Sequence, residues 1–273
     1  MSRESGTDYW DSLHRAHPGQ FAAVGYSALG EGFNREAYRR LRFPALRALL
    51  IRQGVRPRTL LEAGVGTGAY ARLWRELGVT EWVGVDISGT AVATLRTRFP
   101  KGEFYVLDLA RPGPVLGSRT FDLVTAIDVL YHIVADEDFE TALVWLARRV
   151  GPRGHLVVSD VFTDSPWGRR FPHVKRRPMV AYQGILEPLG LRLVDREPVF
   201  SILGDSVPDG SVRGRMLYEV WRVIQKSIRM MPERFRSAYG AGVVRILFPF
   251  DRTICRLIDS RGIVLELAIF GRT

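Results

Sequence analysis

Residues 60–70 read Leu-Leu-Glu-Ala-Gly-Val-Gly-Thr-Gly-Ala-Tyr, which predicts a strand, a glycine-rich turn and the start of a helix. The alternate glycines Gly64, Gly66 and Gly68 let the backbone approach a ligand closely, because a β-carbon there would collide with it or require a disfavoured φ angle. About twenty residues further on, Asp86 ends the next apolar segment, where a carboxylate can accept two ribose hydroxyls. These features predict a nucleoside site on an α/β sheet.

The position of Glu62 helps to distinguish between two classes of nucleoside-binding site. It stands inside the first strand, directly before the glycines, where an unpaired carboxylate would be costly to bury. Dinucleotide-binding folds keep this position apolar and space their glycines as G-x-G-x-x-G, whereas this chain has G-x-G-x-G. A cationic ligand, such as the methionine end of S-adenosylmethionine with its ammonium, would give Glu62 a partner. The residues therefore favour a sulfonium nucleoside over a nicotinamide dinucleotide.

Short apolar runs alternate with helical stretches along the middle of the chain, which is typical of βαβ units and a mostly parallel sheet. We expect strands at Thr59–Ala63, Trp82–Asp86, Glu103–Leu107, Phe121–Ile127, His155–Asp160 and Leu191–Val199, and a last strand at Ile263–Phe270.

Helical additions flank this alternating region. Apolar residues at four-residue spacing predict a helical segment from Tyr9 to about Arg52. After the sixth strand, apolar stripes predict a mainly helical insertion from Val212 to Ser260, broken at Pro249. The expected divisions are an N-terminal helical lid or cap (1–52), a core (53–211), a helical insertion (212–262) and the last strand of the core (263–273).

The order and spacing of these motifs resemble class I S-adenosylmethionine-dependent methyltransferases, over roughly Tyr9 to Phe162, with a looser match to the end. The resemblance implies a Rossmann-like, doubly wound, mostly parallel sheet. It also implies that the last strand inserts antiparallel between the fifth and sixth strands, which ordinary Rossmann dehydrogenases lack. The implied cofactor is S-adenosylmethionine.

The resemblance also implies roles for individual cofactor contacts. Asp86 with Ile87 matches the ribose-binding acid, and Asp108 with Leu109 matches the acidic segment that holds the adenine amino group. Asp128 lies in the loop that borders methionine and substrate. The full implied set is Glu62, Gly64, Gly66, Gly68, Asp86, Ile87, Asp108, Leu109 and Asp128.

A methyl group on a sulfonium is already activated, so the protein mainly has to align a nucleophile and exclude water. A general base is needed only where the acceptor is a hydroxyl or a similarly protonated group. His132 and His173 are the candidate bases, because an imidazole titrates near neutral pH. A helix-start residue hydrogen-bonded to backbone is an equal interpretation of His132.

Aromatic residues predicted around the mouth of the site indicate an aromatic or apolar acceptor. Asp160 ends the fifth strand at the same rim, although a helix or turn cap explains it as well. No close cluster of His, Asp or Glu predicts a metal. The candidate acceptor residues are Tyr131, Asp160, Trp167, Phe171 and Tyr182.

The net charge of +10 raises the question of a polyanionic partner. Residues 165–273 hold 19 basic and 10 acidic side chains, so the excess lies in the C-terminal part, where arginines at helical spacing indicate a solvated helix face. A nucleic-acid methyltransferase remains an alternative. Against it, the segment Asp128-Val129-Leu130-Tyr131 lacks the Asn/Asp-Pro-Pro-aromatic tetrad of enzymes that methylate flipped bases.

A second alternative is a membrane-peripheral lipid or quinone methyltransferase, or a non-catalytic binding protein, based on the basic amphipathic region from Arg213 to Arg261. No apolar run reaches the roughly 18 residues of a membrane span, and no signal peptide is apparent, so a cytoplasmic protein is expected. The arginine-rich composition suggests a bacterial source and specialised metabolism. The lone Cys255 reads as a buried thiol, and the exposed helical additions are compatible with a homodimer.

Overall fold

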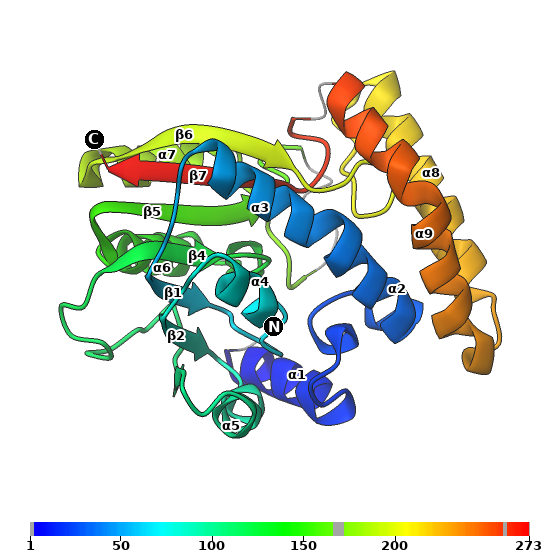
Figure 1. The fold of residues 1–273 in the computed structure, drawn as a ribbon. Helices are drawn as coiled ribbons and strands as arrows, with labels where there is room; N and C mark the ends of the chain where they lie inside the picture. Colours follow the sequence, from blue (N-terminus) through cyan, green and yellow to red (C-terminus); the bar gives the residue numbers. More distant parts are fainter. Residues whose placement is uncertain (1–2, 166–171, 259–260, 273) are drawn as a thin grey trace.

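The computed structural model describes residues 3–165, 172–258 and 261–272 (Figure 1). Its strands are β1 (Thr59–Ala63), β2 (Glu81–Asp86), β3 (Glu103–Val106), β4 (Phe121–Ala126), β5 (Val150–Asp160), β6 (Leu191–Pro198) and β7 (Glu266–Arg272). They form one sheet in the order β3-β2-β1-β4-β5-β7-β6. Neighbouring strands pair in parallel except β7, which is antiparallel to both β5 and β6. The expected position of the last strand is thus confirmed.

The strand bounds differ from the expected ones by at most one residue, except in β5 and β7. β5 begins five residues before His155, at Val150, and reaches β4 through a register shift between Phe121 and Leu123. β7 begins at Glu266 rather than Ile263. The apolar residues before it are buried instead against the loop after β6, where Val199 and Val207 donate their N–H groups to the carbonyls of Leu265 and Ile263.

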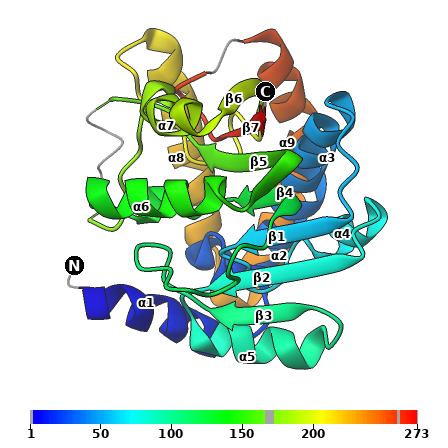
Figure 2. The same ribbon diagram turned by 90° about the vertical axis from the view of Figure 1, so that its left-hand side faces the viewer.

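Helices cover both faces of the sheet. They are α1 (Arg3–Ala16), α2 (Gly30–Ala37), α3 (Phe43–Arg52), α4 (Ala71–Glu76), α5 (Gly89–Arg98), α6 (Asp136–Ala147), α7 (Met179–Leu186), α8 (Val212–Arg229) and α9 (Glu233–Leu257). Figure 2 shows α6 and α7 on one face and α3 on the other. Successive strand residues therefore enter different cores: Leu60 belongs to the same buried cluster as Leu46 of α3, and Leu61 to that of Leu143 of α6.

The N-terminal segment is helical but not continuous. A π-helical turn, Tyr38–Arg42, joins α2 to α3, whereas short 3-10 turns separate α1 from α2. The expected helical segment from Tyr9 to Arg52 is thus divided into several helices. α2 packs closely against α9: a β-carbon on Gly32 would lie 2.0 Å from the Ser237 carbonyl oxygen. This glycine lets the insertion lie directly on the N-terminal segment.

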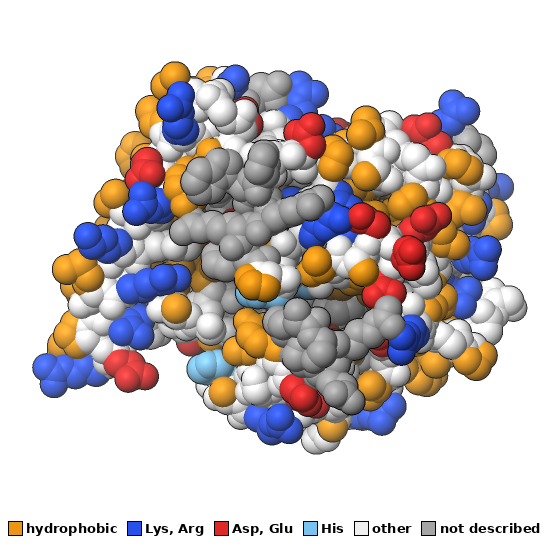
Figure 3. Space-filling view, turned by 180° about the vertical axis from the view of Figure 1, so that it is seen from behind, with side chains coloured by type: hydrophobic (Ala, Val, Ile, Leu, Met, Phe, Trp, Pro, Cys, Tyr) orange, Lys and Arg blue, Asp and Glu red, His pale blue; other side chains and the backbone are white. Residues whose placement is uncertain are grey.

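The insertion forms two helices, α8 and α9. They make one edge of the molecule, on the right in Figure 1 and on the left in the view from behind (Figure 3). The expected break at Pro249 is wrong, because α9 continues through it. Two residues later the fully buried Asp251 accepts hydrogen bonds from the backbone N–H groups of residues 201–203, which fixes the helix beyond the proline.

Candidate active site

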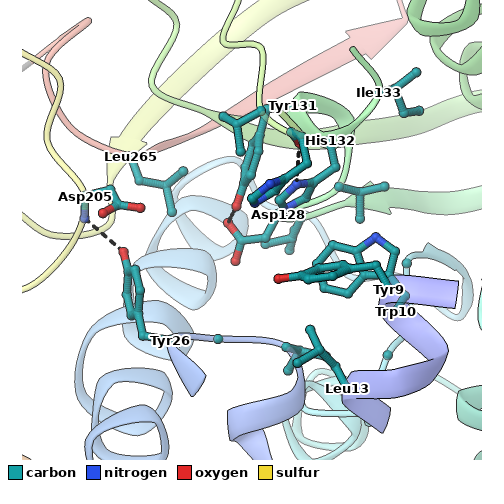
Figure 4. Close-up of a pocket in the computed structure, with 18 of the residues that line it drawn as sticks. Tyr9, Trp10, Leu13, Tyr26, Asp128, Tyr131, His132, Ile133, Asp205 and Leu265 are labelled. Atoms are coloured by element: carbon teal, nitrogen blue, oxygen red, sulfur yellow. Dashed lines mark hydrogen bonds between the residues drawn. The ribbon is translucent and has the colours of Figure 1, made fainter. Parts of the chain in front are cut away.

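A cavity of about 940 Å³ opens at the carboxyl ends of β1, β2 and β4. In a parallel sheet these ends meet at one edge, where α/β proteins bind ligands. α1 and the loop after β4 form further parts of the wall (Figure 4). The helix α8 completes it. The volume lies in the usual range of small-molecule sites.

The glycine turn after β1 forms part of this wall. Gly64 has φ +68° and Gly66 has φ +51°, and both line the cavity. A β-carbon on Gly64 would lie 2.1 Å from the Val129 side chain, and one on Gly66 would lie 2.6 Å from Val24. Only glycine fits this cradle. Gly68 does not line the cavity; its backbone packs against Leu95 and Phe99 instead, so the structure does not support its expected contact with the cofactor.

Asp86 lies at the end of β2, where it is 8% exposed and lines the cavity. Its Oδ2 accepts the N–H of Gly66 at 2.8 Å, and its Oδ1 accepts the N–H of Ser88 at 2.9 Å. Burial raises the pKa of the Asp86 carboxyl. The two backbone bonds hold the carboxylate rigidly at the cavity wall. The other residues predicted to contact the ribose and adenine also line the cavity: Ile87, Asp108 and Leu109.

Glu62 has protein partners that the sequence analysis missed. Its Oε2 accepts the indole N–H of Trp74 at 2.7 Å and that of Trp82 at 2.9 Å. The expectation of a carboxylate without a protein partner is therefore wrong. Burial, with a smaller contribution from the charge of Asp86, still raises the pKa of Glu62 to about 8. Glu62 also lines the cavity, so a cation bound there would stabilise its ionised form.

Asp128 lies in the loop after β4 and adopts φ +61°, a strained value for a residue with a side chain. It forms a largely buried ion pair with Arg42, from the π-helical turn of the N-terminal segment. Its Oδ1 accepts the hydroxyl of Tyr131 at 3.3 Å and that of Ser159 at 3.2 Å. These contacts tie the N-terminal segment to the loop at the centre of the cavity. The sequence analysis missed Arg42.

The two candidate bases both lie in the cavity wall, and Figure 4 shows His132 there beside Tyr131. The rings of His132 and His173 stack with their centroids 5.9 Å apart. The Nδ1–H of His132 donates to the backbone carbonyl of His173 at 3.1 Å, which leaves Nε2 as the acceptor nitrogen. Burial lowers the pKa of His132 to about 4. Trp10 of α1 contacts His132 edge-on, with centroids 5.0 Å apart.

The other acceptor predictions have mixed outcomes. Tyr131 lines the cavity, with the guanidinium of Arg176 over its ring at 3.9 Å. Asp160 and Tyr182 do not line it: both are fully buried behind the wall, where the Tyr182 hydroxyl donates to Asp160 at 2.8 Å. Asp160 also pairs with Arg176 at 3.3 Å, so its role is to hold that arginine. Trp167 and Phe171 lie outside the described residues.

Two helices contribute cavity residues that the sequence analysis missed. α1 supplies Tyr9, Trp10, Leu13 and His14. It is fastened to the start of α5 through Asp11, which accepts from the Ser88 hydroxyl and, at 3.1 Å, from the N–H of Thr90. α8 supplies Tyr218, Trp221, Arg222, Gln225 and Arg229. The sequence contains a signal that could have predicted this wall, because helical spacing places four of these residues on one face of the helix: Tyr218, Arg222, Gln225 and Arg229.

The sheet order, the antiparallel last strand and the glycine turn beside Asp86 define a Rossmann-like methyltransferase fold. A model of a methyltransferase domain family matches residues 33–186, which is more than half of the chain. The protein belongs to this family.

Comparisons with individual proteins agree with this family. The O-methyltransferase cnsE of Penicillium expansum is 26% identical over 148 residues, covering 50% of this chain and 52% of that protein. The chain thus matches about half the length of this curated relative. The N-methyltransferase NodS of Bradyrhizobium japonicum WM9, solved with S-adenosyl-L-homocysteine, has a TM-score of 0.55 at 17% identity, covering 97% of this chain and 98% of that chain.

A second solved structure has the same fold along almost the whole chain. The magnesium protoporphyrin IX methyltransferase of Synechocystis PCC 6803, solved with S-adenosylhomocysteine, has a TM-score of 0.53 at 16% identity. The match covers 98% of this chain and 95% of that chain. Both structures support the fold assignment.

Proposed function

We propose that the protein is an S-adenosylmethionine-dependent methyltransferase that acts on a small organic acceptor of aromatic or apolar character. The observation that carries this proposal is one cavity in which the glycine turn and Asp86 face an aromatic wall. That wall includes Tyr9, Trp10 and Tyr131. The family and the ligands of the two solved relatives support the cofactor.

The residues present fit this cofactor. Gly64, Gly66 and Glu62 would hold the methionine part, Asp86 the ribose, and Asp108 the adenine. The bound cofactor supplies an electrophilic methyl group on a positively charged sulfur. Glu62 complements that charge, and the two glycines leave room for backbone contact with the ligand. Two glycines at which a β-carbon would clash with a neighbouring valine indicate a site shaped for close approach.

The acceptor side is enclosed by both helical additions. We propose that residues 1–52 act as a lid, because α1 lies over the cavity and is joined to the core by the contacts of Asp11. The insertion, residues 212–262, forms the opposite wall through α8. Together these walls would position the acceptor and exclude water.

Mass spectrometry of products tests this function most broadly. Phenolic, indolic and sugar acceptors are incubated with the protein and with S-adenosylmethionine that carries a deuterated methyl group. A phenolic or indolic acceptor should gain one labelled methyl group. Transfer to sugars alone would contradict the aromatic acceptor, and failure of the cofactor to bind would contradict the enzyme assignment.

Replacing His132 or His173 with alanine is expected to slow turnover by roughly tenfold or more, with cofactor affinity nearly unchanged. The pKa of His132, which burial lowers to about 4, keeps this imidazole neutral near physiological pH, and its Nε2 can accept a proton. Steady-state kinetics and calorimetry measure the two effects.

His155→Ala is the matched control, because His155 is a half-buried histidine of β5 that does not line the cavity. This variant should keep the wild-type rate. If the His132 and His173 variants also keep it, neither imidazole is the base, and positioning of the acceptor suffices.

Binding of S-adenosylmethionine is expected to release a proton from Glu62 near neutral pH. The pKa of about 8, raised by burial, keeps the carboxyl protonated below that pH in the free protein, and a cation beside it lowers the pKa. Affinity should therefore increase as pH rises, by up to about tenfold per pH unit. It should level off above about pH 8. Calorimetry in buffers of different ionisation enthalpy counts the released protons.

Glu62→Gln is the control for this linkage. The amide oxygen can still accept both tryptophan N–H groups, so the wall keeps its hydrogen bonds. This variant should bind the cofactor without releasing the proton. The same proton count in both proteins would assign the released proton to another group.

A further inference from the structure

The helix α8 has three distinct faces. At about 100° per residue, one stripe faces the core and a second faces the cavity. The third stripe faces solvent although it is apolar, and it is formed by Val212, Met216, Val220 and Val223. Val223 is 67% exposed and Val212 is 77% exposed. The core stripe is Leu217, Trp221, Ile224 and Ile228, and the cavity stripe is Tyr218, Arg222, Gln225 and Arg229.

The helix α9 repeats this arrangement. Its buried side, with Gly240, Ala241 and Val244, packs against α2. Its opposite side carries a second apolar stripe at helical spacing: Phe235, Tyr239, Ile246, Phe250 and Leu257. Their exposed fractions run from 39% at Tyr239 to 79% at Leu257. Large apolar side chains gathered on the exposed faces of neighbouring helices indicate an interaction site.

The same two helices account for most of the net positive charge of the chain. Residues 212–257 contain ten Lys and Arg side chains against three Asp and Glu, a net of +7 out of +10 for the chain. Arg213 and Arg215 flank the stripe of α8, and Arg256 flanks the stripe of α9. Figure 3 shows hydrophobic and basic side chains alternating along the edge that these helices form.

We propose that α8 and α9 form a docking surface for an anionic lipid bilayer. The apolar stripes would enter the boundary between headgroups and acyl chains, and the flanking arginines would contact lipid phosphates. Within the part of the chain that the structure describes, no helix is long and apolar enough to span a bilayer, so these helices would lie along its surface. This proposal is independent of methyl transfer.

Charge and apolarity together favour this occupant over two others. A nucleic acid would match the arginines but would leave the nine exposed apolar side chains of the two stripes facing water. A second copy of the chain would cover the stripes but would bring the arginines that flank them, Arg213, Arg215 and Arg256, against those of the other copy. An anionic bilayer satisfies both features at once.

Vesicle sedimentation tests the surface. Vesicles of phosphatidylcholine with phosphatidylglycerol should bind the protein at least several-fold more than vesicles of phosphatidylcholine alone. The triple variant Val223→Ser/Ile246→Ser/Phe250→Ser should lose roughly tenfold or more in vesicle affinity. Arg213→Gln and Arg215→Gln should each lower it about fivefold, and only on the anionic vesicles. Because all these side chains are exposed, the variants should fold normally, which circular dichroism checks.

Val180→Ser is the matched control, since Val180 is an equally exposed valine, at 70%, on the remote helix α7. It should bind vesicles like the wild type. No binding to anionic vesicles would overturn the proposal. Equal binding by the wild type and the triple variant would also overturn it, as would a dimer in sedimentation velocity that the triple variant abolishes. Binding of S-adenosylmethionine is measured on the same protein samples. A protein that binds the cofactor but not the vesicles would contradict the docking surface and leave the proposed enzyme function intact.

Discussion

Asp86→Ala is expected to weaken S-adenosylmethionine binding by roughly tenfold or more. The carboxylate of Asp86 lines the cavity and would accept two ribose hydroxyls, and alanine offers no acceptor. The variant also frees the N–H of Gly66, which now donates to Oδ2 at 2.8 Å and keeps the glycine turn in place. Isothermal titration calorimetry measures the affinity directly.

Asp122→Ala is the control for this variant. Asp122 also accepts two backbone N–H groups, from Arg58 and Thr59, both at 2.9 Å. It lies at the start of β4, at the opposite end of the strands from the cavity. Its removal costs comparable backbone hydrogen bonds without touching the cavity. Cofactor affinity should therefore stay at the wild-type level in this variant. Unchanged affinity in Asp86→Ala itself would mean that the nucleoside does not bind at the end of β2.

Asp251→Ala is expected to lower the free energy of unfolding by about 3–5 kcal/mol. One oxygen of this fully buried carboxyl accepts the N–H groups of Ser201, Ile202 and Leu203 at 2.9, 2.7 and 3.0 Å. Alanine would leave three buried donors without an acceptor. It would also release α9 from the loop that leads to Asp205 in the cavity wall. Chemical denaturation measures the loss.

Two further variants make this stability prediction specific. Asp209→Ala removes an aspartate that accepts the N–H of Ser211 before α8, but this aspartate is exposed, so the loss should be about 1 kcal/mol. Asp251→Asn keeps one acceptor oxygen and should fall between the wild type and Asp251→Ala. A loss in Asp251→Ala no larger than that in Asp209→Ala would show that the buried contact does not anchor the helix.

The strands and the glycine turn could be predicted because their signals are local. β1 has the predicted bounds, Thr59–Ala63, since an apolar run before three glycines admits few other conformations. Asp86 and Asp108 lie at the cavity because parallel strands bring their carboxyl ends to one edge. The family resemblance supplied the antiparallel last strand, which no local pattern specifies.

Side-chain direction and long-range contacts could not be predicted in the same way. Asp160 ends a strand at the expected end of the sheet, yet it is buried behind the cavity wall, where it contacts Arg176 and Tyr182. The tryptophans that bond Glu62 come from α4 and β2, so only the folded chain brings them together. The walls formed by α1 and α8 likewise depend on how separate helices pack.

A crystal structure of the protein with S-adenosylhomocysteine tests the central claim most directly. The account predicts the ligand in the cavity, with its amino acid end at the turn of Gly64 and Gly66 and its ribose on Asp86. An empty cavity in crystals soaked with this ligand, or a nicotinamide dinucleotide in its place, would contradict it.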